Sequence, residues 1–347
     1  MLHRFAKFLA GCTVLLLLAG SLVTSTDSGL SVPDWPTTYG WNMFTFPPSK
    51  WVGGIFYEHG HRLIASSVGF LTIILAVWLW FAEGRRWMKW LGVAALGAVI
   101  AQGVLGGLTV LFFLPASVST AHAGLAEIFF CLVVAIALFT SPRWLNGYGA
   151  SAAGAASSED GTLQNLATAT TGLVYAQILV GATMRHTGAG LAIPDFPLMF
   201  GHLLPTHWDP KIAIHFAHRL GALVVLTAVV ATVGRVWFRH RQHAELRRAA
   251  MLLAGLVGVQ ITLGAFTVLS ALNVWINSIH VVCGALVLTT SLVLTLRSWR
   301  PAFGEQVEVV RSVRLPPSHE ASADRRSLGG GGQPDRDSLQ PDRGARA

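Results

Sequence analysis

Long apolar runs alternate with shorter polar stretches along most of this 347-residue chain. Each run has about the length that an α-helix needs to cross ~30 Å of hydrocarbon. The runs lie at roughly 8–25, 62–82, 91–112, 121–140, 166–185, 213–234, 250–270 and 277–296. The pattern therefore predicts an all-α integral membrane protein with eight transmembrane helices.

The two halves of the chain resemble each other. GLSVPDWPTTYG at 29–40 matches GLAIPDFPLMFG at 190–201 with an offset of 161, and the tripeptide HRL recurs at 61–63 and 218–220. Three further positions recur in register, namely Gln102, Gly106 and Thr109 against Gln260, Gly264 and Thr267. Because each half holds an even number of spans, we expect two parallel four-helix-bundle repeats, related about an axis along the membrane normal.

The repeat divides the chain into four parts. We expect an N-terminal four-helix half over 1–140, a cytoplasmic linker over 141–165, a C-terminal four-helix half over 166–300 and a cytoplasmic tail over 301–347. The linker is rich in Gly, Ala and Ser, and the tail in Gly, Pro, Arg, Asp and Ser. These compositions favour a flexible connection and a disordered tail.

The first apolar run follows Arg4 and Lys7, which is also the pattern of a cleaved signal peptide. Its partner in the repeat, 166–185, is internal and cannot be removed in that way. We therefore expect the first run to stay in place as a transmembrane helix.

Charge indicates orientation. The chain has 52% hydrophobic and 12% charged residues and a net charge of +8. Because the basic residues that give this charge lie in loops and in the tail, we interpret them as a topology signal and expect no nucleic-acid partner. Basic residues gather at the N-terminus, in alternate connections and in the tail, among them Arg4, Lys7, Arg85, Arg86, Lys89, Arg235, Arg239, Arg241, Arg247 and Arg248. The excess of Lys and Arg on cytoplasmic loops predicts a multi-pass plasma-membrane protein with both termini in the cytoplasm.

Four histidines occupy matching places in the two halves. His61 and His122 are 61 residues apart, and His218 and His280 are 62 apart. We expect each in the first turn or so of a helix, near the outer face. Two imidazoles facing each other across a helical bundle can hold a heme iron from both sides. The alternatives are polar anchors at the membrane interface, or zinc, although neither half offers a compact set of three or four ligands.

One position breaks the repeat. Glu58 lies three residues before His61, on the same face if this stretch is helical, whereas the counterpart of Glu58 at an offset of 157 is His215. A carboxyl group beside an apolar pocket can serve in acid–base chemistry. We infer that the first half carries out the chemistry and the second half holds a permanent cofactor. The alternative is that Glu58 pairs with Arg62 or caps its helix.

Other residues near these helix starts have less certain roles. Arg62 and Arg219 follow their histidines and either donate to heme propionates or lie in the interface as snorkelling cations. The elements 33–36 and 194–197, each Pro-Asp-aromatic-Pro, are expected to form rigid caps, closing over a cofactor pocket or serving as structural plugs. We assign no catalysis to their aspartates. Four more histidines are expected to be ordinary loop residues, namely His59, His186, His202 and His207.

Taken together, these motifs resemble the heme A synthase family. The resemblance covers 8–296 and depends on the stretches 20–40, 58–62, 120–124, 190–197, 215–219 and 277–280. It implies oxidation of the C8 methyl of heme O to a formyl group, by two hydroxylations and loss of water, to give heme A for terminal oxidases. Implied partners are heme O and membrane lipid, with a heme O synthase (a farnesyltransferase) and oxidase assembly factors as further candidates.

The resemblance also implies roles for individual residues. His61 and His122 would flank the heme O/heme A site, His218 and His280 would ligate heme b, and Glu58 matches the family's essential acid. Many members carry a cysteine pair in an outward loop. The three cysteines here, Cys12, Cys131 and Cys283, all lie in apolar segments. Any mechanism that needs loop thiols is therefore in doubt for this chain.

The main alternative function is a diheme electron-transfer cytochrome linked to quinol, which makes no new product. Such an electron conduit needs no asymmetry like that between Glu58 and His215. A repeat-built transporter is disfavoured because its polar site would lie at the membrane midplane.

Overall fold

The computed structural model describes residues 1–145 and 160–300, and the regular structure in these ranges is helical apart from two isolated bridges. Eight of the helices are long and apolar enough to cross a membrane, which confirms the predicted all-α membrane architecture. They are α1 (Leu2–Ser25), α2 (Gly54–Ala82), α3 (Arg86–Leu111), α4 (Ala116–Phe139), α6 (Gly161–His186), α7 (Pro210–Arg239), α8 (Ala244–Leu269) and α9 (Val274–Ser298). The short helices are η1 (Met43–Thr45), η2 (Pro48–Lys50) and α5 (Pro142–Leu145).

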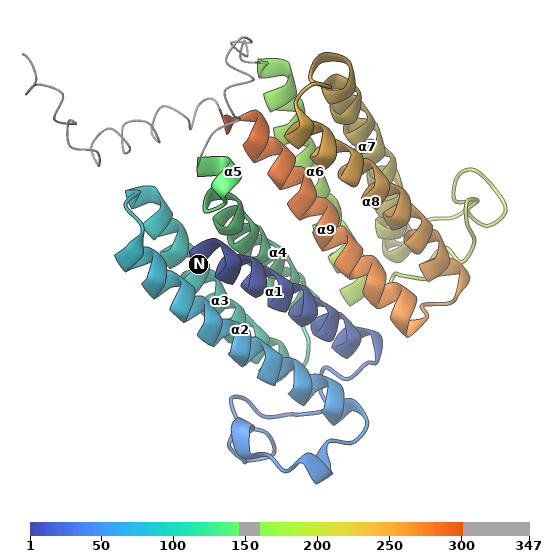
Figure 1. The fold of residues 1–347 in the computed structure, drawn as a ribbon. Helices are drawn as coiled ribbons and strands as arrows, with labels where there is room; N and C mark the ends of the chain where they lie inside the picture. Colours follow the sequence, from blue (N-terminus) through green and yellow to red (C-terminus); the bar gives the residue numbers. More distant parts are fainter. Residues whose placement is uncertain (146–159, 301–347) are drawn as a thin grey trace, which may run out of the picture.

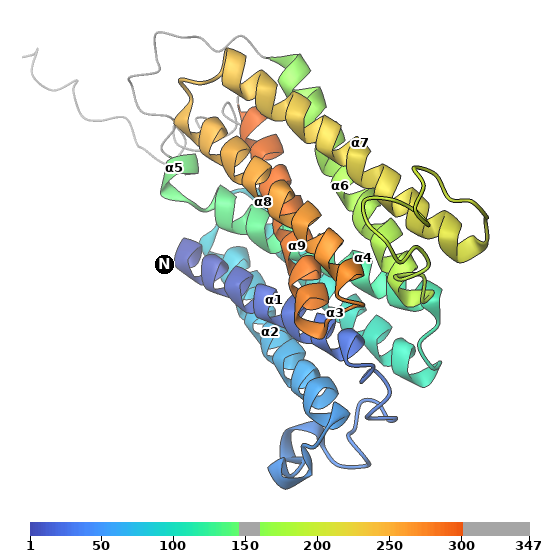
Figure 2. The ribbon, with the colours of Figure 1, turned by 90° about the vertical axis from the view of Figure 1, so that its right-hand side faces the viewer.

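The helices of the two halves pack in the same order. In the first half α1 contacts α2 and α4, and α3 contacts α2 and α4; α6, α7, α8 and α9 repeat these contacts in the second half. The halves meet where α1 packs on α9, α4 on α6, and α4 on α9 (Figure 1, Figure 2). Each half is therefore a four-helix bundle whose first and last helices also form the seam between the halves.

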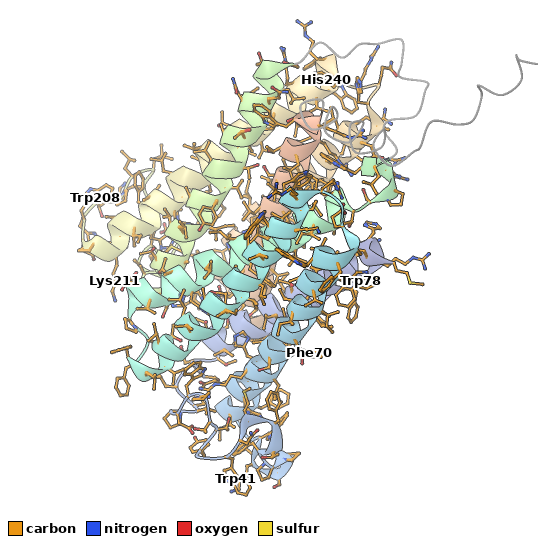
Figure 3. The ribbon with its side chains drawn as sticks, turned by 90° about the vertical axis from the view of Figure 1, so that its left-hand side faces the viewer. Trp41, Phe70, Trp78, Trp208, Lys211 and His240 are labelled. Carbon is orange, nitrogen blue, oxygen red and sulfur yellow. The ribbon has the colours of Figure 1, made fainter. Side chains whose placement is uncertain are left out.

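Both long loops, 26–53 and 187–209, leave the bundle at one end, which we call the loop end (Figure 1). Met1 and α5 lie at the opposite end. Figure 3 shows the same polarity, with Trp41 at the loop end and His240 at the far end. The two ends are therefore chemically different.

The apolar core of each half fills the end opposite the loops. In the first half it includes Leu9 of α1, Leu75 and Leu79 of α2, and Ile136 of α4, all fully buried. In the second half, side chains such as Leu253 occupy the equivalent end.

Charged groups tie the helices together at this opposite end. Asp160 caps α6 by accepting a hydrogen bond from the Leu163 N–H at 3.1 Å, and it pairs with Arg235 at 2.9 Å and His240 at 2.7 Å. The hydrogen bonds from Arg235 hold the pKa of Asp160 far below its ordinary value, against the opposing effect of burial. Asp160, expected in the linker, is thus part of a structural ion cluster.

The linker expected over 141–165 is helical in both parts that the structure describes. Residues 142–145 form α5, and α6 begins at Gly161. The middle of the expected linker, 146–159, and the expected tail beyond 300 lie outside the described residues.

Polar side chains join the halves near the loop end of the seam. Arg185 of α6 donates to the Ser21 carbonyl at 2.9 Å and to the Ser25 hydroxyl at 2.7 Å, both on α1. Ser25 also hydrogen-bonds to Ser278 of α9 at 2.9 Å. The first helix is therefore held by the second half as well as by its own bundle.

Candidate functional site

The structure brings the four matched histidines together as two pairs. His61 on α2 lies near His122 on α4, and His280 on α9 lies near His218 on α7. Each pair faces inward near the loop end of its own bundle. The pairs are those that the repeat predicts.

Their depth differs from the prediction. The histidines stand six to eight residues after the first residue of their helices rather than in the first turn. At 1.5 Å per residue this is about 10 Å along the helix axis. The difference arises because the helices extend beyond the apolar runs: α2, for example, begins at Gly54, whereas the run begins near 62. Interfacial polar residues continue the helix without raising hydropathy.

The donor set fits heme ligation. The Nδ1 atoms of His61, His122 and His280 are buried and have no hydrogen-bond partner, which is unusual for buried polar atoms. Nδ1 of His218 lies 3.0 Å from the side-chain amide of Gln177. Within residues 1–145 and 160–300, no three His, Cys, Asp or Glu side chains gather as a metal-ion site would require. Two opposed imidazoles per bundle suffice for heme iron but not for zinc.

Glu58 and Arg62 form a buried pair next to the first histidine. Their side chains are 4% and 10% exposed, and Nη2 of Arg62 lies 2.7 Å from Oε1 of Glu58. The other carboxyl oxygen of Glu58 accepts the Val32 N–H at 2.7 Å. Since α2 already includes residue 58, Glu58 and His61 stand three residues apart on one helix. The carboxyl group therefore connects the start of the first loop to the helix that carries the first histidine.

Arg62 clamps the first loop through its main chain. Its guanidinium donates to the carbonyls of Val32, Asp34 and Thr37 at 2.9, 2.7 and 3.0 Å. The pairing of Arg62 with Glu58 is the alternative considered for Glu58 from the sequence. The contacts with the loop carbonyls correspond to neither role considered for Arg62. A contact with a propionate remains a prediction.

Arg219 repeats the clamp in the second half. It donates to the carbonyls of Ile193, Asp195 and Leu198 at 3.1, 2.7 and 3.0 Å. His215, the counterpart of Glu58, is buried, and its Nδ1 lies 3.3 Å from the Ile193 nitrogen. Both loops are thus anchored alike, but only the first anchor contains a carboxylate.

Each loop is folded around its aspartate. Asp34 accepts hydrogen bonds from the N–H groups of Tyr39 and Gly40 at 2.7 and 2.9 Å. Asp195 does the same with Phe200 and Gly201 at 2.8 Å each. Burial acts to raise the pKa of Asp34, but its hydrogen bonds outweigh this and leave the pKa below the ordinary value. Both aspartates shape their loops, which agrees with assigning them no catalysis.

The first loop reaches the bundle through Trp35. A Cβ added to Gly107 of α3 would lie 2.5 Å from the Trp35 ring, so the indole lies directly on the helix backbone. The preceding residue, Gly106, faces His122. Trp35 therefore covers α3 immediately beside the first histidine pair.

Two of the histidines expected in loops are helical. His59 lies on α2, is fully buried, and contacts Thr38 at 3.1 Å from its Nδ1. His186 is the last residue of α6 and lies near His122. Sequence spacing missed both because the helix ends extend beyond the apolar runs. His202 and His207 do lie in a loop, as expected.

A pocket of about 620 Å³ lies between α3, α4 and α6, and neither His61 nor His122 lines it. Its lining is mostly apolar and includes Ala121, Gly124 and Leu179, with the Tyr175 ring at one side. At the equivalent positions of the second half, an offset of 158 places Ile279 and Val282 where the first half has Ala121 and Gly124. Small side chains of α4 therefore leave space on the face of α4 that meets α6.

Comparisons with known proteins agree with this architecture. The COX15-CtaA family, described as cytochrome oxidase assembly protein, matches residues 3–292. The chain is 32% identical over 285 residues to the heme A synthase of Symbiobacterium thermophilum, covering 79% of this chain and 89% of that protein. It is 28% identical over 309 residues to the heme A synthase of Geobacillus kaustophilus, covering 86% and 94%. The heme A synthase of Caulobacter sp. is 29% identical over 332 residues, covering 82% and 92%. The chain therefore belongs to the COX15-CtaA family of cytochrome oxidase assembly proteins.

Proposed function

We propose that this protein is a heme A synthase, a membrane oxidoreductase that converts the C8 methyl of heme O to a formyl group. The observation that carries the proposal is the pair of bis-imidazole sites, of which only the first has a buried carboxyl group, Glu58, one helical turn from its histidine. A duplicated electron carrier has no need of this difference. The names of the relatives support the same activity.

The substrate site is assigned to His61 and His122. Two features support this assignment: the buried Glu58, and the mostly apolar pocket between α3, α4 and α6, lined by Ala121, the residue before His122. Heme O carries a long isoprenoid side chain, which heme b lacks, so a substrate site needs additional apolar space. The bulkier residues at the equivalent positions of the second half suit a resident heme b between His218 and His280.

The chemistry is two successive hydroxylations of one methyl group. Each replaces a C–H bond by C–OH and, with water as the oxygen source, releases two protons and an electron pair; loss of water from the geminal diol leaves the formyl group. A heme b at the second site would relay the four electrons one at a time to an external electron acceptor, which is the oxidant of the reaction.

The chain's own residues position and enclose the substrate. His61 and His122 hold it from opposite sides, and Trp35 and the Arg62 clamp cover the loop end of the site, which limits the access of water. Glu58 is proposed to accept a released proton or to stabilise positive charge developing at the reacting carbon. The positions of basic residues support a plasma-membrane location with the loop end outside and both termini in the cytoplasm.

The activity is tested by pigment extraction. The protein is co-produced with a heme O synthase in cells without heme A, and the hemes are extracted in acid–acetone and separated. We expect heme A only when this protein is present. Accumulation of heme O alone, with heme b bound to the protein, would favour the diheme cytochrome.

The role of Glu58 is tested with two variants. Glu58→Gln keeps an oxygen that can accept the Val32 N–H but removes the charge, whereas Glu58→Ala removes both. We expect both variants to bind heme b, and both to lower heme A output by roughly a hundredfold or more, as for loss of an acid–base group. Normal output from Glu58→Gln with loss only in Glu58→Ala would assign the residue to holding the loop.

A further inference from the structure

A glycine on a neighbouring helix faces each of the four matched histidines. Gly20 of α1 faces His61, Gly106 of α3 faces His122, Gly181 of α6 faces His218, and Gly264 of α8 faces His280. For each glycine, the three atoms nearest to an added Cβ all belong to the imidazole ring. We call these four residues the seat glycines.

The contact is made through the same edge of every ring. An added Cβ would lie 2.9 Å from Cε1 of His61, 3.3 Å from that of His122, 2.7 Å from that of His218 and 3.1 Å from that of His280. Cε1 is the nearest atom in all four cases. Because Cε1 lies between the two ring nitrogens, a contact there limits rotation of the ring and fixes the directions in which both nitrogens point.

This arrangement is specific to these glycines. On the same four helices, a Cβ added to Gly11, Gly97, Gly172 or Gly258 would meet nothing within 4 Å. Glycine is frequent in membrane helices, so its occurrence alone indicates little. Four equivalent glycines that each face a paired histidine need a common explanation.

A ligating histidine is usually oriented by a hydrogen bond from its second ring nitrogen. Here Nδ1 has no partner in His61, His122 and His280. Nε2 of His280 lies 3.4 Å from the side-chain amide of Gln260. Packing against the seat glycine is the contact that all of these rings share. His218 has Gln177 in addition, 3.0 Å from its Nδ1.

We propose that the seat glycines are positioning residues, which set the rotation of the histidine rings and thereby the geometry of the axial ligands in both sites. This inference rests on the proposed binding of heme by the two histidine pairs. The distance from an added Cβ to the histidine ring ranks the four seat glycines. An added methyl group is accommodated least well at Gly181, then at Gly20, and more readily at Gly264 and Gly106.

The resident site gives the clearest test, because its heme is expected to purify with the protein. Gly181→Ala is compared with Gly172→Ala, which adds the same methyl to α6 in open space. Heme per protein is measured, together with the low-spin electron paramagnetic resonance signal of the ferric form. We expect Gly181→Ala to lose at least half of its heme or to shift this signal, and Gly172→Ala to match the unchanged protein.

Folding is monitored by far-ultraviolet circular dichroism and gel filtration. Alanine favours helices over glycine, so neither change should impair the helix itself. If Gly181→Ala does not fold, Gly264→Ala provides the milder version at 3.1 Å from His280, with Gly258→Ala as its control.

The outcomes separate the inference from the proposed function. Unchanged protein that lacks a low-spin bis-histidine signal would contradict the heme sites themselves. If the unchanged protein shows the signal and a folded seat-glycine variant has the same heme content and the same spectrum, the positioning role alone is overturned.

Discussion

Replacing Arg62 by Met should release the first loop. The guanidinium of Arg62 donates to three loop carbonyls and to Glu58, and both side chains of the ion pair are almost fully buried. Methionine fills a similar volume but donates nothing. The loop carbonyls can turn to water, whereas the Glu58 carboxylate is left buried beside α2 without its cation.

The unpaired carboxylate dominates the magnitude. Removing one partner of a buried ion pair costs about 3–5 kcal/mol. Since 1.4 kcal/mol corresponds to a tenfold change in an equilibrium, opening of the loop should become more frequent by roughly a hundredfold or more. Arg219→Met removes a clamp of the same design with no carboxylate in it, and should cost clearly less.

Amide hydrogen exchange measures this opening directly. The Val32 N–H is bound by Glu58, so its exchange should accelerate in Arg62→Met and remain unchanged in Arg219→Met, where only the loop 187–209 should respond. Adding Glu58→Gln to Arg62→Met should restore part of the protection, because the buried charge is removed. Exchange of Val32 at its normal rate in Arg62→Met would refute the reasoning.

Two further predictions concern other contacts. Asp160→Asn keeps an oxygen that can cap α6 but removes the charge that pairs with Arg235 and His240, so it should destabilise the protein by up to about 1 kcal/mol near neutral pH. The pKa of Asp160 is depressed in the folded protein, so the charged carboxylate stabilises the fold above the ordinary aspartate pKa of about 3.9, and this stabilisation is lost as the pH falls through the folded pKa. The difference in Tm between the variant and the unchanged protein should therefore shrink on acidification. A difference that stays constant would contradict this. Gly107→Ala should displace Trp35 and loosen the first loop, because overpacking costs about 1–3 kcal/mol, and tryptic cleavage after Lys50 should become roughly tenfold faster. Gly103→Ala adds the same methyl where it meets nothing within 4 Å and should leave cleavage unchanged. Equal cleavage in both variants would count against the Trp35 contact.

The spans and the histidine pairs could be predicted from sequence because both follow from one-dimensional signals. Hydrocarbon thickness imposes a run length, and duplication places His61 and His218 in register. Helix ends could not be placed in this way. Hydropathy detects the part of a helix inside hydrocarbon, whereas α7 begins where Asp209 caps it by accepting from the Lys211 and Ile212 N–H groups. The histidines are deeper in their helices than expected for this reason.

The contacts around the sites depend on features with no sequence signature. Arg62 and Arg219 bind main-chain carbonyls, which every residue possesses. The seat glycines face their histidines only because adjacent helices have a particular rotation about their axes, which apolar periodicity does not determine. Motif spacing identified the histidines but not the residues that hold them.

The contacts of Arg62 and Arg219 with the loops 26–53 and 187–209 also determine how these loops respond to redox conditions. Both loops contain no cysteine, and each is held by an arginine that donates to main-chain carbonyls of the loop. The covers over the two sites therefore need no thiol oxidation to form. They should keep their shape equally well under reducing and oxidising conditions.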